Sequence, residues 1–68
     1  MSVARITEIK ATSTKSFDDA INEGIKRAAK KLENVKGAWV ASQEVMVNGK
    51  GKITEYRVLL KVTFILKE

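Results

Sequence analysis

Apolar and polar residues alternate over the last quarter of the chain, from Ile53 to Lys67. From Tyr56 onward every second position is apolar, and the set comprises Tyr56, Val58, Leu60, Val62, Phe64 and Leu66, whereas the intervening positions are mixed. A period of two is typical of a β-strand with one buried face, whereas helical spacing would scatter these residues around the whole circumference. We therefore predict a long third strand that lies on the core through these six side chains.

A second pattern, with apolar or small residues three and four positions apart, follows a polar turn at 13–16. It comprises Phe17, Ala20, Ile21, Gly24, Ile25, Ala28, Ala29 and Leu32. This spacing predicts an amphipathic helix from Phe17 to Glu33. Ser16 is the predicted N-cap, because its hydroxyl can accept from the free amides of the first turn. The basic residues of the opposite face, Lys26, Arg27, Lys30 and Lys31, are interpreted as a solvated surface.

Two further segments read as strands, Val3 to Thr12 and Val35 to Val47, and Asn48-Gly49 predicts a hairpin after the second. The hairpin makes the second and third strands antiparallel. The helix returns the chain, so the first and second strands run in the same direction. The expected fold is α+β with the order β-α-β-β: one domain, residues 1–68, whose three-stranded antiparallel sheet has the order 1-3-2 and wraps around the helix.

One helix covers only one face of such a sheet. Strict alternation places the following residues on the other face: Arg5, Trp39, Val45, Val47, Ile53, Glu55, Arg57, Leu59, Lys61 and Ile65. A half-apolar open face on a small domain is typical of a contact surface. A chain this short builds a thin core that oligomerisation can supplement, so we expect a homo-oligomer.

The amino-acid composition excludes several kinds of functional site. The 68 residues include no Cys and no His, which excludes disulfides, thiolate or imidazole metal ligands and a His general base. The prediction is a binding protein and not an enzyme. The net charge of +5 permits a nucleic-acid-binding module as an alternative, although no aromatic residue interleaves the helical lysines. No signal peptide or membrane-length apolar run is visible, so we expect a cytoplasmic location.

Two segments resemble the dodecin family. Thr12-Ser13 followed by Ser16-Phe17-Asp18-Asp19-Ala20 resembles the dodecin turn and helix start, T-S and then S-[WF]-x-[DE]-A. The run from Tyr56 to Phe64 is similar to the dodecin ending Y-x-V-x-L-x-V-x-F. The resemblance implies β-α-β-β subunits that assemble into hollow homododecameric shells. It also implies storage or sequestration of a flavin, riboflavin or FMN, stacked between symmetry-related tryptophans.

The resemblance places the candidate cofactor-binding residues at Gly37, Trp39 and Arg57. In flavin-binding members the stacking tryptophan directly follows the helix-to-strand link, where this chain has Gly37, and Trp39 comes two residues later on the same face. A glutamine that contacts the flavin ring follows the tyrosine in those members, whereas Arg57 follows Tyr56 here. The chain is therefore similar to the dodecin-like proteins linked to cations or to no ligand.

Each candidate has a structural alternative. Trp39 can stack on a planar ligand or pack in a subunit interface, where tryptophan is enriched, and the interface is favoured. Arg57 can hold a phosphate, but an ion pair with Glu55, Glu44 or a symmetry mate is favoured. A hard cation held by Glu8, Glu44 and Glu55 would need symmetry-related copies, because their spacing matches no calcium-binding loop.

Overall fold

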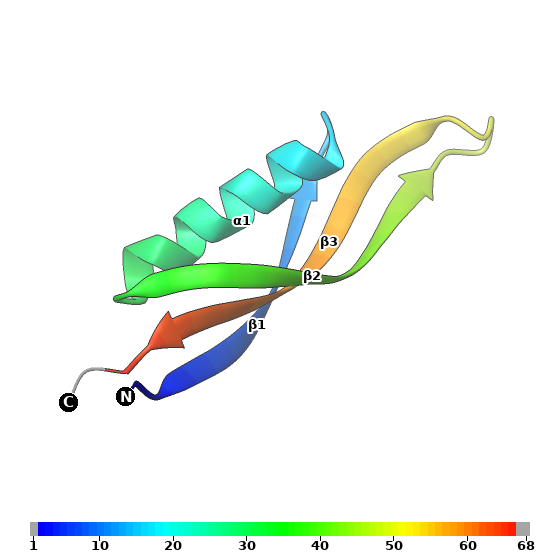
Figure 1. The fold of residues 1–68 in the computed structure, drawn as a ribbon. Coiled ribbons are helices and arrows are strands. Elements are labelled where there is room, and N and C mark those ends of the chain that lie inside the picture. Colours follow the sequence, from blue (N-terminus) through cyan, green and yellow to red (C-terminus); the bar gives the residue numbers. More distant parts are fainter. Residues whose placement is uncertain (1, 67–68) are drawn as a thin grey trace.

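The computed structural model describes residues 2–66 and contains one helix packed on one sheet (Figure 1). The elements are β1 (Ala4–Ser13), α1 (Phe17–Lys31), β2 (Val35–Val47) and β3 (Ile53–Ile65). The sheet is antiparallel with the order β1-β3-β2. The predicted α+β fold is thus confirmed, with the third strand at its centre.

The element boundaries lie close to those expected. β2 has the predicted bounds, and β1 is displaced by one residue toward the C-terminus. α1 ends at Lys31, two residues before the expected end. β3 ends at Ile65, so Leu66 is exposed beyond the strand and does not belong to the buried face. Lys67, the expected last residue of this strand, lies outside the described residues.

The start of α1 is fixed by two serines. The Ser16 hydroxyl accepts a hydrogen bond from the amide of Asp19 at 2.9 Å, so the predicted N-cap is confirmed. The buried Ser13 hydroxyl donates to Asp19 Oδ2 at 2.6 Å and accepts from the amide of Lys15 at 2.9 Å. These bonds join the end of β1 to the first turn of α1, and they explain why a polar Ser–Ser turn connects two apolar elements.

Two short connections complete the chain. After the C-cap residue Leu32, Asn34 adopts a left-handed φ of 61°, which asparagine tolerates better than most residues. The predicted hairpin between β2 and β3 is also confirmed, but its backbone differs from the one expected. The positive φ lies at Gly51, and the Asn48 side chain accepts from the amides of Lys50 and Lys52.

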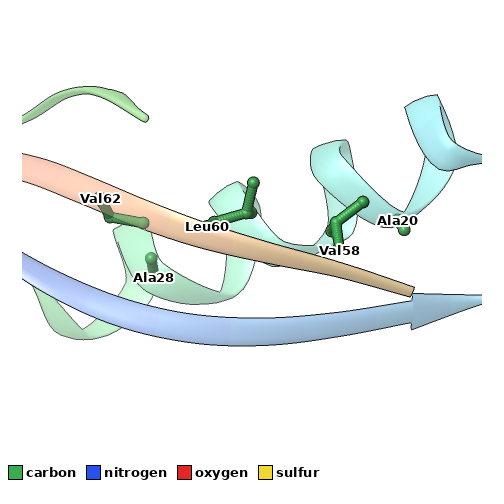
Figure 2. Packing of buried hydrophobic residues seen from close by; sticks show 5 residues of the cluster. All are labelled: Ala20, Ala28, Val58, Leu60 and Val62. Atoms are coloured by element: carbon green, nitrogen blue, oxygen red, sulfur yellow. The ribbon is translucent and has the colours of Figure 1, made fainter. Parts of the chain in front are cut away.

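The core lies between α1 and β3. Among residues 2–66, five apolar residues are buried, namely Ala20, Ala28, Val58, Leu60 and Val62. Figure 2 shows Ala20 and Ala28 on the helix and the other three side chains on the central strand. The Phe17 ring packs edge-on against Tyr56 at one end of this core, with 5.2 Å between the ring centroids. The strand face predicted from the period of two is therefore the covered face.

Small residues on α1 allow it to lie close to the sheet. A Cβ at Gly24 would lie 3.0 Å from Ala11 Cβ and 3.0 Å from Leu60 Cδ1, which is shorter than an ordinary van der Waals contact. Glycine at this position is thus set by the space between the helix and β1, although it costs helix propensity.

The pairing register corrects part of the predicted face assignment. β2 has an irregularity between Val40 and Ser42, where an extra residue, Ala41, has no partner of its own. Directly opposed residues share a face, and one extra residue reverses the alternation beyond it. Val45 pairs with Tyr56 and therefore lies on the helix side, contrary to the prediction.

Three other side chains also lie on the face opposite to the one that strict alternation gives. Alternation from Trp39 on the open face would turn Ser42 and Met46 toward the helix, but they pair with Leu59 and Glu55 and lie on the open face. Arg5 was expected on the open face, but it pairs with Phe64 and lies on the helix side. Its position follows from the β1–β3 register, which strand alternation alone does not determine.

The protomer is elongated. Its radius of gyration is 14.1 Å, whereas a compact chain of this length would have about 11 Å. Figure 1 shows that the β2–β3 hairpin extends past the N-terminal start of α1. A protomer of this shape buries little of its own apolar surface, which favours association with further copies.

Candidate functional site on the open face of the sheet

The open face is the sheet surface opposite α1, and its central part consists of four rows of residues across the three strands. Each row takes one residue from β1, one from β3 and one from β2. The rows are Ile6–Thr63–Gly37, Glu8–Lys61–Trp39, Lys10–Leu59–Ser42 and Thr12–Arg57–Glu44. The sheet thus brings together charged, aromatic and aliphatic side chains on a surface that the helix leaves uncovered.

Trp39 is the most exposed large apolar residue on this face. Its fractional exposure is 66%, and the Lys61 ammonium lies 5.2 Å from the ring centroid. An ammonium over an indole face is attracted by the negative charge of the π-system. The contact orients both side chains, so the ring is available as a flat surface with one cation already beside it.

Gly37 lies in the neighbouring row, opposite Thr63. A Cβ placed on it would meet no atom within 4 Å. Gly37 and Trp39 are two residues apart on the same face, as the sequence predicted. Nothing in the protomer therefore prevents a larger side chain at Gly37.

Arg57 forms an ion pair with Glu55. Its Nε and Nη2 atoms both donate to Glu55 Oε1, at 3.2 and 2.8 Å, and both side chains are partly exposed. Glu44 is the cross-strand neighbour of Arg57. Arg57, Glu44 and Lys10 line a shallow hollow of about 370 Å³ in the open face. The ion pair favoured from the sequence is confirmed, and a phosphate would have to share this guanidinium with Glu55.

The three candidate residues do not converge within one protomer. Lys61, which is paired with Trp39, is four residues from Arg57 along β3, a separation of about 13 Å. Gly37 lies one row further away. A compact ligand in contact with both Trp39 and Arg57 would therefore need side chains from two copies of the chain.

The open face is partly apolar. Its exposed apolar residues are Ile6, Trp39, Met46, Val47 and Ile53. A continuous half-apolar surface that one helix cannot cover is typical of a subunit interface.

Three carboxylates also lie on the open face. Glu8 and Glu44 belong to the second and fourth rows, and Glu55 pairs with Met46. Within residues 2–66, no three metal-ligating side chains of one protomer gather closely enough to hold an ion. A cation site built from these carboxylates would require more than one copy of the chain.

Two features of this face were missed at the sequence level. The partnership of Lys61 with Trp39 follows from the β2–β3 register, and the face of Glu44 follows from the bulge at Ala41. The sequence did show that Trp39 and Lys61 lie on the same face of the sheet. Alternation along each strand does not, however, show which residues of neighbouring strands stand opposite each other.

Comparison with known proteins gives one consistent family. The family model for Dodecin matches residues 3–67. Calcium dodecin of Mycobacterium tuberculosis is 36% identical over 67 residues, which cover 98% of this chain and 93% of that protein.

Solved structures have the same fold. A dodecin from Streptomyces davaonensis superposes with a TM-score of 0.91 at 36% identity, covering 98% of this chain and 97% of the other. A Thermus thermophilus protein superposes at 0.91 with 29% identity, covering 100% and 98%. The structure of M. tuberculosis calcium dodecin, described as having a novel calcium-binding site, gives 0.82 at 33% identity, covering 97% and 93%. Separately, no helix in the described part of the chain is long and apolar enough to cross a membrane.

Proposed function

Because this chain belongs to the dodecin family, we propose that it forms a homododecameric shell that binds and stores a small ligand between the open faces of its subunits. The observation that supports this proposal most directly is that the open face exposes Trp39 and several aliphatic side chains, which α1 of the same protomer does not cover. Burial of such a face against other copies would supplement the small core, which has five buried apolar residues in the part of the chain that the structure describes.

The assembly is tested by size-exclusion chromatography with light scattering. The expected mass is about twelve times the 7.6 kDa of one chain. Ile6→Lys places a charge on the open face and is expected to weaken assembly, whereas Lys50→Glu at the hairpin tip changes the charge at an exposed loop position and is not. A folded wild-type monomer at micromolar concentration would contradict the proposal.

The first candidate ligand is a flavin. Trp39 offers an exposed indole face, and Lys61 and Arg57 supply positive charge on the same surface. Planar rings stack on aromatic faces, and the charges favour the phosphorylated FMN over riboflavin. Gly37 supplies no ring, so flavin affinity should be lower than in family members with tryptophan at that place. Nothing in this arrangement resembles a catalytic site, and we propose storage without chemical conversion.

The flavin proposal is tested by fluorescence-quenching titrations with riboflavin and FMN. We expect weak wild-type binding, further loss in Trp39→Ala and a gain in Gly37→Trp. Base–aromatic stacking contributes roughly 1–3 kcal/mol elsewhere, so each added ring should strengthen binding by about 5- to 150-fold. Tight wild-type binding that survives Trp39→Ala would mean that the ligand lies elsewhere.

The second candidate ligand is calcium. It is favoured by the 36% identity to a protein named calcium dodecin and by the position of Glu8, Glu44 and Glu55 on the open face. Calcium prefers carboxylate oxygens, and symmetry-related copies would have to complete its coordination.

Terbium provides a direct test of this second candidate, because Trp39 lies in the same row as Glu8 and can sensitise terbium luminescence. Calcium should displace terbium from the assembled protein. Glu8→Gln and Glu44→Gln should weaken the binding of both terbium and calcium, whereas Glu23→Gln on the helix side should not. Luminescence insensitive to the two open-face substitutions would exclude these carboxylates as ligands.

A further inference from the structure

A second concave surface lies on the helix side of the sheet, away from Trp39 and Arg57. It is a groove of about 610 Å³ between α1 and β1. β1 is an edge strand that pairs only with β3, so the groove lies beside an open edge of the sheet. Its volume is within the range typical of small-molecule sites, which is about 300–1,000 Å³.

The inner surface of the groove is apolar. It is formed by Ile9 and Ala11 of β1 and by Gly24, Ala28 and Leu32 at the helix. The small residues Ala11 and Gly24 bring the two elements close together at the floor of the groove, where Ile9 Cδ1 and Leu60 Cδ1 lie within 4 Å of the position that a Gly24 Cβ would take. An aliphatic or aromatic body could therefore be shielded from water in this groove.

The rim of the groove is strongly basic. Four cationic side chains of α1 line it, namely Lys26, Arg27, Lys30 and Lys31, together with one carboxylate, Glu23. Lys10 borders the groove from β1, but its side chain lies on the open face of the sheet. Within residues 2–66, none of these cations forms an ion pair with a carboxylate.

The helix moreover places Lys26 before Lys30 and Arg27 before Lys31 at spacings of four residues. Like charges at this spacing repel each other. A bound anion would relieve that repulsion.

We infer that this groove binds a small amphipathic anion, whose apolar body lies on the half-buried side chains of Ile9, Ala11 and Leu32 and whose acidic head group contacts Arg27 and Lys31. A nucleic-acid backbone suits the groove less well, because its inner surface is apolar and no aromatic ring is available for base stacking. The inference concerns the opposite side of the sheet from the proposed flavin or calcium site, and it does not depend on either ligand.

The test is isothermal titration calorimetry of the assembled protein with decanoate, kept below its micellar concentration. Wild-type protein is expected to bind decanoate and not decyltrimethylammonium, which has the same apolar chain and the opposite charge. Arg27→Glu/Lys31→Glu should weaken binding by about tenfold or more, since each lost charge-assisted hydrogen bond is worth at least that factor.

Controls separate a local effect from a general one. Lys50→Glu/Lys52→Glu changes the net charge equally but lies in the hairpin, outside the groove, and should alter affinity by less than about twofold because distant charges are screened. Arg27→Gln/Lys31→Gln is a milder variant in case the charge reversal prevents folding, which circular dichroism would reveal.

Three results would overturn the inference. One is the absence of decanoate binding, as expected if a neighbouring subunit covers the groove. Another is equal weakening by the groove and hairpin double substitutions. The third is binding to phosphatidylglycerol vesicles without binding of dissolved decanoate, which would mean that a membrane surface is the occupant.

Discussion

The Lys61 ammonium lies 5.2 Å from the centroid of the Trp39 ring, and the two residues are direct cross-strand partners on β3 and β2. Glu8 of β1 stands on the other side of Lys61 in the same row. The most exposed aromatic ring of the protein is therefore held beside a cation that itself has an acidic neighbour. This row gives the open face a charged and aromatic centre.

The first prediction concerns the coupling between Trp39 and Lys61. A double-mutant cycle with Lys61→Met and Trp39→Leu should give a coupling free energy of about 0.5–1 kcal/mol if the pair is exposed, and about 2 kcal/mol if assembly removes it from water. Urea unfolding at several protein concentrations measures it and separates dissociation from unfolding. A coupling of zero at all concentrations would mean that the contact does not form in solution.

The second prediction concerns the cap of α1. Ser16→Ala removes the hydroxyl that accepts from the Asp19 amide, and it should lower the free energy of unfolding by about 1 kcal/mol. Thr14→Ala in the same exposed turn is the matched control and should change it by less than about 0.5 kcal/mol. Equal effects of the two substitutions would show that the loss is not due to the cap.

The third prediction compares two glycines. Gly24→Ala should destabilise the protein by about 1–3 kcal/mol, because the added Cβ would lie 3.0 Å from the Cβ of Ala11, an atom fixed to the strand backbone. This cost should exceed the gain in helix propensity of about 1 kcal/mol.

The same substitution at Gly37 should have the opposite sign. Gly37 lies in a strand with nothing within 4 Å of the new atom, so Gly37→Ala should stabilise by about 0.5–1 kcal/mol. Thermal unfolding followed by circular dichroism checks both variants. Stabilisation by Gly24→Ala would contradict the close packing of α1 against β1.

The fourth prediction concerns Arg57. Arg57→Gln removes its ion pair with Glu55, but a partly exposed pair contributes only about 0–1 kcal/mol, so stability should change little. If the proposed flavin site is correct, the preference for FMN over riboflavin should fall at the same time. Lys50→Gln in the hairpin is the control of equal charge. An unchanged ratio of the two dissociation constants would mean that Arg57 does not contact the phosphate.

The sequence determined the elements of this protein because their signals are local. Alternation along Val58, Leu60 and Val62 identified the covered face of β3, and the Ser16 hydroxyl identified the helix start. Element order then determined the sheet order, since a hairpin fixes one antiparallel pair and the helix returns the chain for the other. Each step depends on residues that are near each other along the chain.

The tertiary structure decided which open-face side chains meet. One unpaired residue, Ala41, reverses the faces beyond it, so that Glu44 and not Val45 shares a surface with Trp39. Bulges and register are set by how two strands pair, and the alternation within one strand does not show which residues of its neighbour stand opposite. The sequence could therefore name Gly37, Trp39 and Arg57 as candidates, but only the paired sheet separates Arg57 from the other two and places Lys61 beside Trp39.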